Sequence, residues 1–253
     1  MSFYTFLIFG LLSSFCVAEE LPPIPPMPQY PAKLPAGVNP LTFPTGSFGW
    51  FDRVKQNIAD TKKNADTCEL VFDGDSITDG WHGVGHAVWQ QHYARFHPLD
   101  FGILGDRTQH VLWRLLQGQA AGMHPKLIVL MIGTNNVTRN TDEEVVAGIR
   151  AVIDGYRKCC PDAVILLQAI LPRMEKPQDP YRAKIKDVNA MISHFDDGKK
   201  VIFVDFGDKI LQPDGTISKD VLSDFTHPTA KGYEIWADAI QPFIDRYMGD
   251  QPK

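Results

Sequence analysis

Five short and almost uninterrupted apolar runs recur between residues 69 and 204 of this chain, and amphipathic segments separate them. The runs predict strands at 69–72, 99–103, 127–132, 163–169 and 201–204. Strands without a polar face are typical of a parallel sheet that is buried on both sides. The alternation of such strands with helical segments therefore predicts an α/β fold, with helices on both faces of a parallel sheet.

The segments between the strands carry helix signals. Thr141 and Glu144 have the spacing of a capping box, which marks the start of a helix. The apolar residues that follow at helical spacing are Val145, Ile149, Val152 and Tyr156. A last helix is expected from the stripe formed by Ile235, Trp236, Ala239, Ile240, Phe243, Ile244 and Tyr247.

Composition narrows the class of protein. With 253 residues, 44% of them hydrophobic, the chain can bury one large core. Its net charge of −5 lacks the basic footprint of a nucleic-acid-binding protein, so no nucleic-acid partner is expected. Four cysteines are too few for a scaffold built from disulfides.

The N-terminus has the pattern of a secretory signal. An uncharged apolar run from Phe3 to Val17 is shorter than the ~20 residues that a bilayer span needs, and small residues end it at Ala18. We expect residues 1–18 to be a signal peptide, which places the mature protein outside the cell or in the periplasm with no membrane span left. The alternative is that the segment stays uncleaved as a membrane anchor.

A proline-rich segment follows the expected signal. Nine of the chain's 19 prolines lie within 21–44. Proline lacks a backbone N–H and fixes φ, so this stretch cannot enter a helix or a sheet interior. Residues 19–46 are expected to form an extended spacer, and residues 47–250 the folded domain.

Polar and glycine residues follow each expected strand. In chain order they are 73–78 (DGDSIT), 102–106 (GILGD), 133–136 (GTNN), 171–173 (LPR) and, after a longer segment beyond the fifth strand, 224–227 (DFTH). The carboxyl ends of parallel strands are where ligands bind in open α/β sheets. A serine, a histidine, an acid, an amide and two glycine turns are the parts of an acyl-transfer site. Each motif alone is equally well explained as a turn or a helix cap.

Taken together, these motifs resemble the GDSL or SGNH hydrolase superfamily. The segments that carry the resemblance are GDSIT (74–78), FGILGD (101–106), GTNN (133–136) and DFTH (224–227). The run 105–115 is similar to the catalytic subunits of platelet-activating-factor acetylhydrolases and their bacterial relatives. The resemblance spans about residues 66–247. It implies a three-layer α/β/α sandwich with a five-stranded parallel sheet, the flavodoxin-like fold of that superfamily.

The resemblance also assigns roles to individual residues. Ser76 is the expected nucleophile, His227 the general base and Asp224 the acid that orients it. The expected oxyanion hole consists of the backbone N–H groups of Ser76 and Gly105 and the side-chain amide of Asn135. Histidine titrates near pH 6.5, so it can take the serine proton and return it to a leaving alcohol. This chemistry needs neither a metal nor a cofactor.

The chain departs from the superfamily pattern at Leu104, where many relatives have a second glycine, and at Met174, where relatives often have glycine. Both departures bear on substrate choice. Ile77, Thr134 and Thr226 adjoin the expected nucleophile, amide and base, and with Leu104 we expect them to line the acyl side of the site.

Other polar residues have simpler interpretations. Asp75 is expected to bind the backbone of the nucleophile turn. His82 and His86 could share one helix face, but no third ligand is nearby, so a zinc site is not expected. Of the three cysteines beyond the signal, Cys68, Cys159 and Cys160, at least one thiol should be free or pair with another chain.

The sequence therefore predicts a secreted, cofactor-free serine esterase that removes short acyl groups, most plausibly acetyl, from a glycan or a phospholipid. Two alternatives remain: a non-catalytic ligand-binding module on the same fold, and a lipase or lysophospholipase for longer chains. The oligomeric state and the choice between glycan and phospholipid stay open.

Overall fold

The computed structural model describes residues 49–249. The expected signal peptide (1–18), the expected spacer (19–46) and the outermost residues of the expected domain (47–250) lie outside the described residues. Among those described, no helix has the length and apolar character needed to cross a bilayer.

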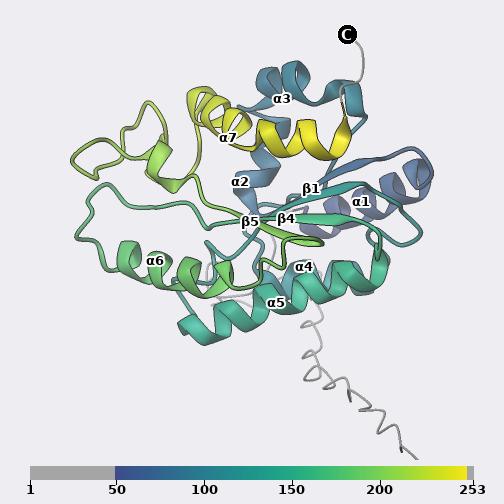
Figure 1. Cartoon of the computed structure of the whole chain (residues 1–253), viewed down its shortest axis with the longest axis horizontal. Helices are drawn as coiled ribbons and strands as arrows, with labels where there is room; N and C mark the ends of the chain where they lie inside the picture. Colours follow the sequence, from purple (N-terminus) through teal and green to yellow (C-terminus); the bar gives the residue numbers. More distant parts are fainter. Residues whose placement is uncertain (1–48, 250–253) are drawn as a thin grey trace, which may run out of the picture.

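A five-stranded parallel sheet forms the middle layer (Figure 1). Its strands are β1 (Leu70–Gly74), β2 (Leu99–Asp100), β3 (Leu127–Met131), β4 (Val164–Gln168) and β5 (Val201–Val204). They lie in the order β2-β1-β3-β4-β5, and every neighbouring pair is parallel. The α/β fold expected from the apolar runs is confirmed.

Helices cover both faces of the sheet (Figure 1). One face carries α4 (Thr108–Leu116), α5 (Asp142–Cys159) and α6 (Pro180–Ser193), and the other carries α2 (Ser76–Asp79), α3 (His86–His92) and α7 (Ala230–Met248). The first helix, α1 (Trp50–Asn64), covers the outer edge of β2, where Arg53 and Asn57 donate to the carbonyls of Asp100 and Phe101. Short 3₁₀ turns lie at 80–82, 94–96 and 207–210.

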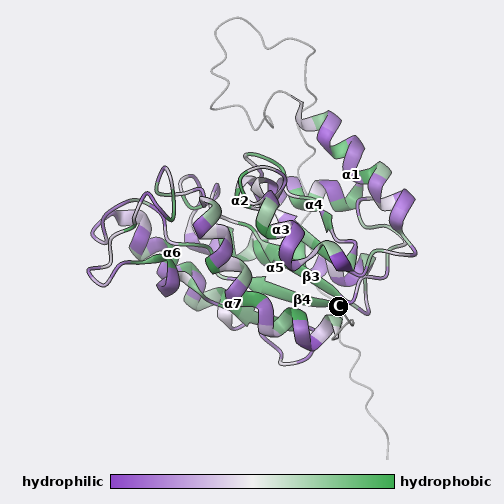
Figure 2. Cartoon of the chain, turned by 90° about the horizontal axis from the view of Figure 1, so that it is seen from above, coloured by the Kyte–Doolittle hydropathy of each residue, from purple (hydrophilic) through white to green (hydrophobic). Residues whose placement is uncertain are grey.

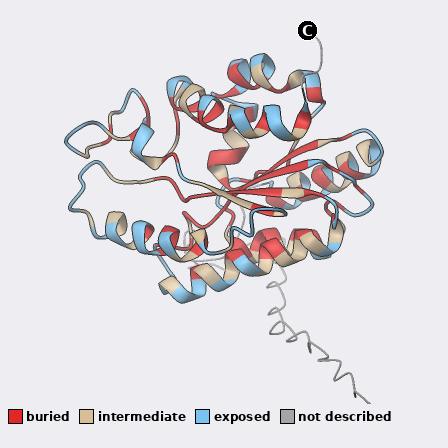
Figure 3. Ribbon diagram, viewed as in Figure 1, coloured by how far each residue is buried: buried red, intermediate tan, exposed pale blue. Residues whose placement is uncertain are grey.

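Successive strand residues point to opposite faces, so each strand contributes to two cores. In β1, Val71 packs under α4 and α5, whereas Leu70 and Phe72 pack under α3 and α7. Figure 3 shows the central strands as buried, and Figure 2 shows that apolar residues concentrate there while polar residues dominate the outer helix surfaces. This double burial explains why the strand sequences have almost no polar alternation.

Four strands differ from the expected bounds, β3 by a single residue at one end, β4 by a single residue at each end, and β1 and β2 by more. The first extends to Gly74, because the Asp73 carboxylate is fully buried among hydrogen-bond donors and so tolerates a place in the sheet. The second ends at Asp100 rather than at residue 103, because the Asp100 side chain accepts the N–H of Gly102 at 2.7 Å and turns the chain.

The strand order sets the place of the candidate site. The connection after β1 leads to β2 on one side of β1, and β3 lies on the other side, so the topology switches at β1 and β3. Ligands bind at such switch points, outside the carboxyl ends of the strands. Ser76, Gly105 and Asn135 follow β1, β2 and β3 respectively, and therefore share this edge.

The capping box expected at the start of α5 is confirmed. Thr141 Oγ1 accepts the N–H of Glu144 at 3.3 Å, and the Glu144 carboxylate accepts the N–H of Thr141 at 3.1 Å.

Because Thr141→Ala leaves a helical N–H without its partner, we expect it to lower the free energy of unfolding by about 1 kcal/mol. Urea unfolding measures the change. Thr138→Ala, at an exposed turn residue, is the control and should stay within about 0.5 kcal/mol of the parent; an equal loss in both variants would contradict the capping role.

Candidate active site

The turn that carries Ser76, the expected nucleophile, follows directly from β1 and is called the nucleophile turn. Ser76 is the first residue of α2, and the buried Asp75 caps this helix by accepting the N–H of Ile77 at 3.0 Å. A Cβ on Gly74 would lie 2.2 Å from the carbonyl oxygen of Met131, so only glycine lets β1 and β3 meet this closely beneath the turn. The turn thereby presents Ser76, which is partly exposed, at the edge of the sheet.

Ser76, His227 and Asp224 form a continuous chain of hydrogen bonds. Ser76 Oγ lies 2.8 Å from His227 Nε2, and His227 Nδ1 lies 2.7 Å from Asp224 Oδ2. The residues come from opposite ends of the domain, since the histidine loop (residues 222–228) precedes α7 and the serine follows β1. The sequence motifs are thus brought together with the geometry of a nucleophile, a base and an orienting acid.

The histidine loop holds its own acid in place. The other carboxylate oxygen of Asp224 accepts the backbone N–H groups of His227 at 2.7 Å and Thr226 at 3.1 Å. Although partial burial opposes ionisation, the bonds from His227 and Thr226 keep the pKa of Asp224 below its ordinary value. The Asp224 side chain is 57% exposed and that of His227 41%, so the site is shallow and open to solvent.

The three expected oxyanion donors lie on neighbouring loops of the same edge. Gly105 has φ 80°, a backbone conformation that favours glycine, and a Cβ there would meet no atom within 4 Å. The side-chain amide of Asn135 donates to the carbonyl of Asp106 at 2.9 Å, which ties the amide loop (residues 133–136) to the glycine turn. The second N–H of that amide is the one available for a substrate oxygen.

The four residues expected to line the acyl side differ in how far they are buried. Ile77 is 2% exposed and belongs to the core under α3 and α7, and Thr134 is 4% exposed. Thr226 is partly buried, while Leu104 is 48% exposed at the tip of the glycine turn. Ile77 and Thr134 are therefore buried, and Leu104 and Thr226 are the members of this set that reach the surface.

A buried ion network supports the site, and the sequence motifs gave no sign of it. Arg114 in α4 lies 2.9 Å from Asp73 and 2.8 Å from Asp106, and all three side chains are fully buried. Asp106 also accepts the indole N–H of Trp50 at 2.6 Å. The network links the end of β1 to the residue that follows Gly105.

Arg173 and Met174 form a second set of contacts behind the site. Arg173 Nη1 donates to the carbonyl of Thr134 at 3.0 Å, and the N–H of Met174 donates to the carbonyl of Phe225 at 2.9 Å. In the sequence, Met174 is notable only as a departure from the superfamily pattern. Its φ of 66° is the left-handed conformation that glycine adopts most easily and that a side chain such as methionine rarely adopts.

The remaining polar candidates stay apart from the site. In residues 49–249, no three histidine, cysteine or acidic side chains come close enough to hold a metal ion. Cys68, Cys159 and Cys160 are all free thiols, and burial raises the pKa of Cys68 to about 11. His82 lies 3.2 Å from the buried Asp100.

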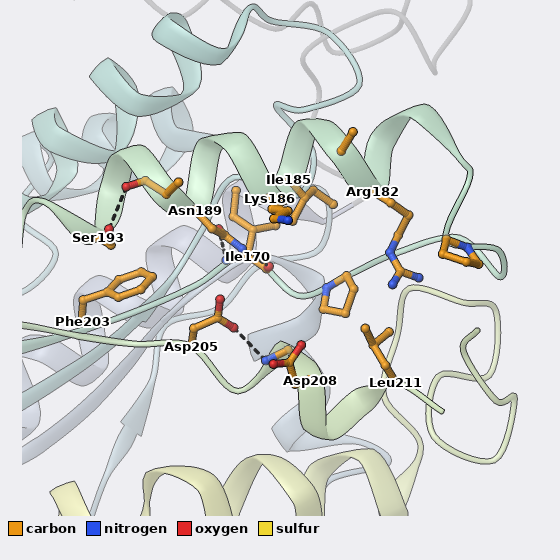
Figure 4. Close-up of a pocket in the computed structure, with 15 residues that line it drawn as sticks. Ile170, Arg182, Ile185, Lys186, Asn189, Ser193, Phe203, Asp205, Asp208 and Leu211 are labelled. Carbon is orange, nitrogen blue, oxygen red and sulfur yellow. Dashed lines mark hydrogen bonds between the residues drawn. The ribbon is translucent and has the colours of Figure 1, made fainter. Parts of the chain in front are cut away.

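A cavity of about 660 Å³ lies between α6 and the segment after β5 (Figure 4). Lys186 and Arg182 line the α6 side, and Asp205 and Asp208 line the opposite side. None of the serine, histidine and acid of the hydrogen-bonded chain lines it. Arg182 also donates to the carbonyl of Met174 at 3.4 Å. The wall of this cavity is therefore in contact with Met174, the residue that binds the histidine loop at Phe225.

Comparison with known proteins identifies relatives across nearly the whole described domain. The sequence profile of the GDSL-like lipase/acylhydrolase family matches residues 72–235. Platelet-activating factor acetylhydrolase IB subunit alpha1 of Rattus norvegicus is 35% identical over 219 residues, covering 84% of this chain and 92% of that protein. The same subunit of Homo sapiens is 34% identical over 217 residues, with 83% and 91% covered.

Solved structures share the fold. A GDSL-like lipase from Bacteroides thetaiotaomicron superposes with a TM-score of 0.64 at 22% identity, covering 79% of this chain and 99% of that one. An acetylxylan esterase from Geobacillus stearothermophilus superposes with a TM-score of 0.55 at 22% identity, with 72% and 94% covered. The three-layer arrangement expected from the sequence is confirmed.

The buried acid beside the nucleophile makes the stability of the protein depend on pH. Burial raises the pKa of Asp75 from 3.8 to about 7. Between these values the native state holds a proton that the unfolded state has lost. The resulting stabilisation is complete below pH 3.8 and is lost as the pH rises through 7. The free energy of unfolding should therefore fall with rising pH, with a contribution from Asp75 of at most about 1.4 kcal/mol per pH unit.

Urea unfolding from pH 5 to pH 8 measures this slope. Asp75→Asn keeps an oxygen that can accept the Ile77 N–H but removes the titrating proton, so the slope should become shallower. Asp52→Asn, at a side chain that is 83% exposed, is the matched control and should keep the parent slope. Equal slopes in all three proteins would show that Asp75 does not titrate in this range.

Proposed function

Because the chain belongs to the GDSL-like lipase/acylhydrolase family and is an ester hydrolase, we propose that it cleaves short-chain esters, above all acetyl esters, with Ser76, His227 and Asp224 as its catalytic triad. The observation that carries the proposal is the hydrogen-bonded chain from Ser76 Oγ through the imidazole to the Asp224 carboxylate. A serine hydroxyl is a weak nucleophile on its own, and this arrangement gives it a base within reach.

In the proposed acylation step, His227 Nε2 takes the proton of Ser76 as Oγ attacks the ester carbonyl. Asp224 keeps the imidazole in the tautomer that has its proton on Nδ1 and stabilises the imidazolium that forms. The carbonyl oxygen becomes negative and is stabilised by the N–H groups of Ser76 and Gly105 and by the amide of Asn135. Collapse of the intermediate breaks the ester C–O bond, and His227 returns the proton to the leaving alcohol.

Deacylation repeats these roles with water. His227 takes a proton from a water molecule as its oxygen attacks the acyl-serine, and the same donors stabilise the second oxyanion. When this intermediate collapses, the acid leaves and Ser76 recovers its proton from His227. The shallow site leaves the alcohol side open, which suits an ester of a large alcohol.

Two relatives favour acetyl as the acyl group. One bears the name of an acetylhydrolase for platelet-activating factor, and the other is named an acetylxylan esterase. The shared chemistry is an acetyl ester, carried by a phospholipid in one case and by a glycan in the other. Parallel assays on acetylated phospholipid and on acetylated xylooligosaccharide distinguish the two sources.

The expected export is also part of the proposal. The apolar run that ends at Ala18 supports a cleaved signal, and the proline-rich stretch after it supports a spacer between the cleavage site and the domain. N-terminal sequencing of exported protein should begin at Glu19. A chain that retains Met1 in the membrane fraction would favour the uncleaved anchor.

The first prediction for this function concerns the nucleophile. Ser76→Ala should lower kcat for p-nitrophenyl acetate by at least about 10⁴-fold, because the triad acts as a unit. The urea midpoint should change little, since Ser76 is partly exposed. Ser193→Ala is the control: this serine also lies on a helix, where its Oγ donates to the carbonyl of Ala190. Retention of most of the activity by pure Ser76→Ala would remove the assignment.

The second prediction concerns acyl length. A pocket that buries a long chain gains about 0.8 kcal/mol per CH₂ group, whereas the packed Ile77 and Thr134 leave no depth for one. We expect kcat/KM for p-nitrophenyl acetate to exceed that for the octanoyl ester by about tenfold or more, measured below the micelle concentration. Because Leu104 is expected to crowd the entrance, Leu104→Ala should make the ratio of kcat/KM between the acetyl and octanoyl esters smaller. Faster cleavage of the octanoyl ester by the parent would favour the lipase alternative.

A further inference from the structure

Two residues in the segment between β4 and α6 connect the amide loop with the histidine loop. Arg173 donates from Nη1 to the carbonyl of Thr134, the residue before the oxyanion amide, at 3.0 Å. The backbone N–H of Met174 donates to the carbonyl of Phe225, in the middle of the histidine loop, at 2.9 Å. One short segment therefore contacts the backbone on both sides of the proposed reaction centre.

The backbone at this contact is held in an unfavourable conformation. Met174 has φ 66° and Phe225 has φ 61°, and both lie in the left-handed region that side chains other than glycine rarely adopt. The hydrogen bond joins these two residues to each other, and Arg182 donates to the carbonyl of Met174 at 3.4 Å. Strained backbone of this kind persists where the surroundings fix it, and it concentrates at functional sites.

The guanidinium group also acts on the nucleophile turn. Burial raises the pKa of Asp75, the cap of the Ser76 helix, to about 7, and the positive charge of Arg173 partly offsets that effect. Arg173 Nε is buried and has no hydrogen-bond partner within the described part of the chain. Stability alone does not favour a buried donor without an acceptor, so a functional role accounts better for an arginine here.

We propose that Arg173 is a positioning residue of the active site, which fixes the Asn135 amide through the Thr134 carbonyl and, through Met174, the loop that carries His227. The side-chain hydrogen bond of Arg173 goes to Thr134, whereas that of Ser76 Oγ goes to His227. Arg173 acts by keeping the oxyanion donor and the base at their distances from the nucleophile. The inference rests on the proposed function, because it assigns Arg173 a part in that same reaction.

The test compares kcat and KM for p-nitrophenyl acetate in Arg173→Gln, with each preparation normalised to the active sites that a fluorophosphonate labels. Misplaced donors affect the transition state more than substrate binding, so kcat should fall by about tenfold to a hundredfold, with KM changed by less than about threefold.

Guanidinium ion at a non-denaturing concentration should restore part of kcat to Arg173→Ala, because it can refill the site beside Thr134. Arg157→Gln removes an arginine bond to the carbonyl of Pro161, remote from the site, and should match the parent with and without guanidinium.

Two variants of Met174 provide an independent measurement. Glycine adopts the left-handed conformation freely, whereas a β-branched residue resists it. Met174→Val should therefore have a kcat at least about tenfold below that of Met174→Gly, since valine displaces the bond to Phe225. This pair tests the contact with the histidine loop; if Arg173→Gln fails to fold, the guanidinium rescue of Arg173→Ala decides the part of Arg173 itself.

The outcomes separate this inference from the function on which it rests. If Ser76→Ala is inactive while Arg173→Gln keeps the parent kcat per labelled site, the positioning role is wrong and the esterase mechanism stands. A loss of thermal stability without a loss of kcat per site would assign Arg173 a purely structural role and overturn the inference. If Ser76→Ala retains activity, the proposed mechanism is wrong and the inference falls with it.

Discussion

The contact between Arg114 and the carboxylates of Asp73 and Asp106 is the interaction on which the rest of the molecule depends. All three side chains are fully inaccessible, and the guanidinium lies within 2.9 Å of each acid. Removing one partner of such a pair leaves a buried charge and costs about 3–5 kcal/mol. Because Asp73 ends β1 and Asp106 follows Gly105, the same contact fixes the nucleophile strand relative to the glycine turn.

The proposed oxyanion hole follows from this constraint. The carbonyl of Asp106 holds the amide of Asn135, so the network extends from α4 through the glycine turn to the loop after β3. Trp50 binds the same carboxylate and brings α1 into the arrangement at the edge of β2. Three loops that meet at the topological switch point are thereby positioned by buried polar contacts, since apolar packing alone is not directional.

The fold could be predicted because strands that are buried on both faces of the sheet have a recognisable sequence pattern. The strands of this sheet have almost no polar positions, and the helices between them carry caps such as Thr141 with Glu144. Three of the four site motifs were visible because each follows a strand, and the fourth, at 224–227, lies in the loop before the last helix. What the sequence did not disclose are polar residues whose partners are distant: Asp73 lies 41 residues from Arg114, and nothing local distinguishes a buried carboxylate from a solvated one.

The acidic residues around the site lie in two environments: Asp224 is exposed, whereas Asp75 and Asp106 are buried. Asp224 is half exposed and is held ionised by hydrogen bonds, so it can stabilise a transient imidazolium without itself changing state. Burial instead raises the pKa of Asp75 and Asp106 to about 7, and both acids bind fixed backbone or side-chain donors. The exposed loop that carries His227, the proposed base, thus lies on a layer of buried polar contacts. This arrangement leaves the alcohol side of the site open to solvent while the donors for the acyl oxygen stay fixed.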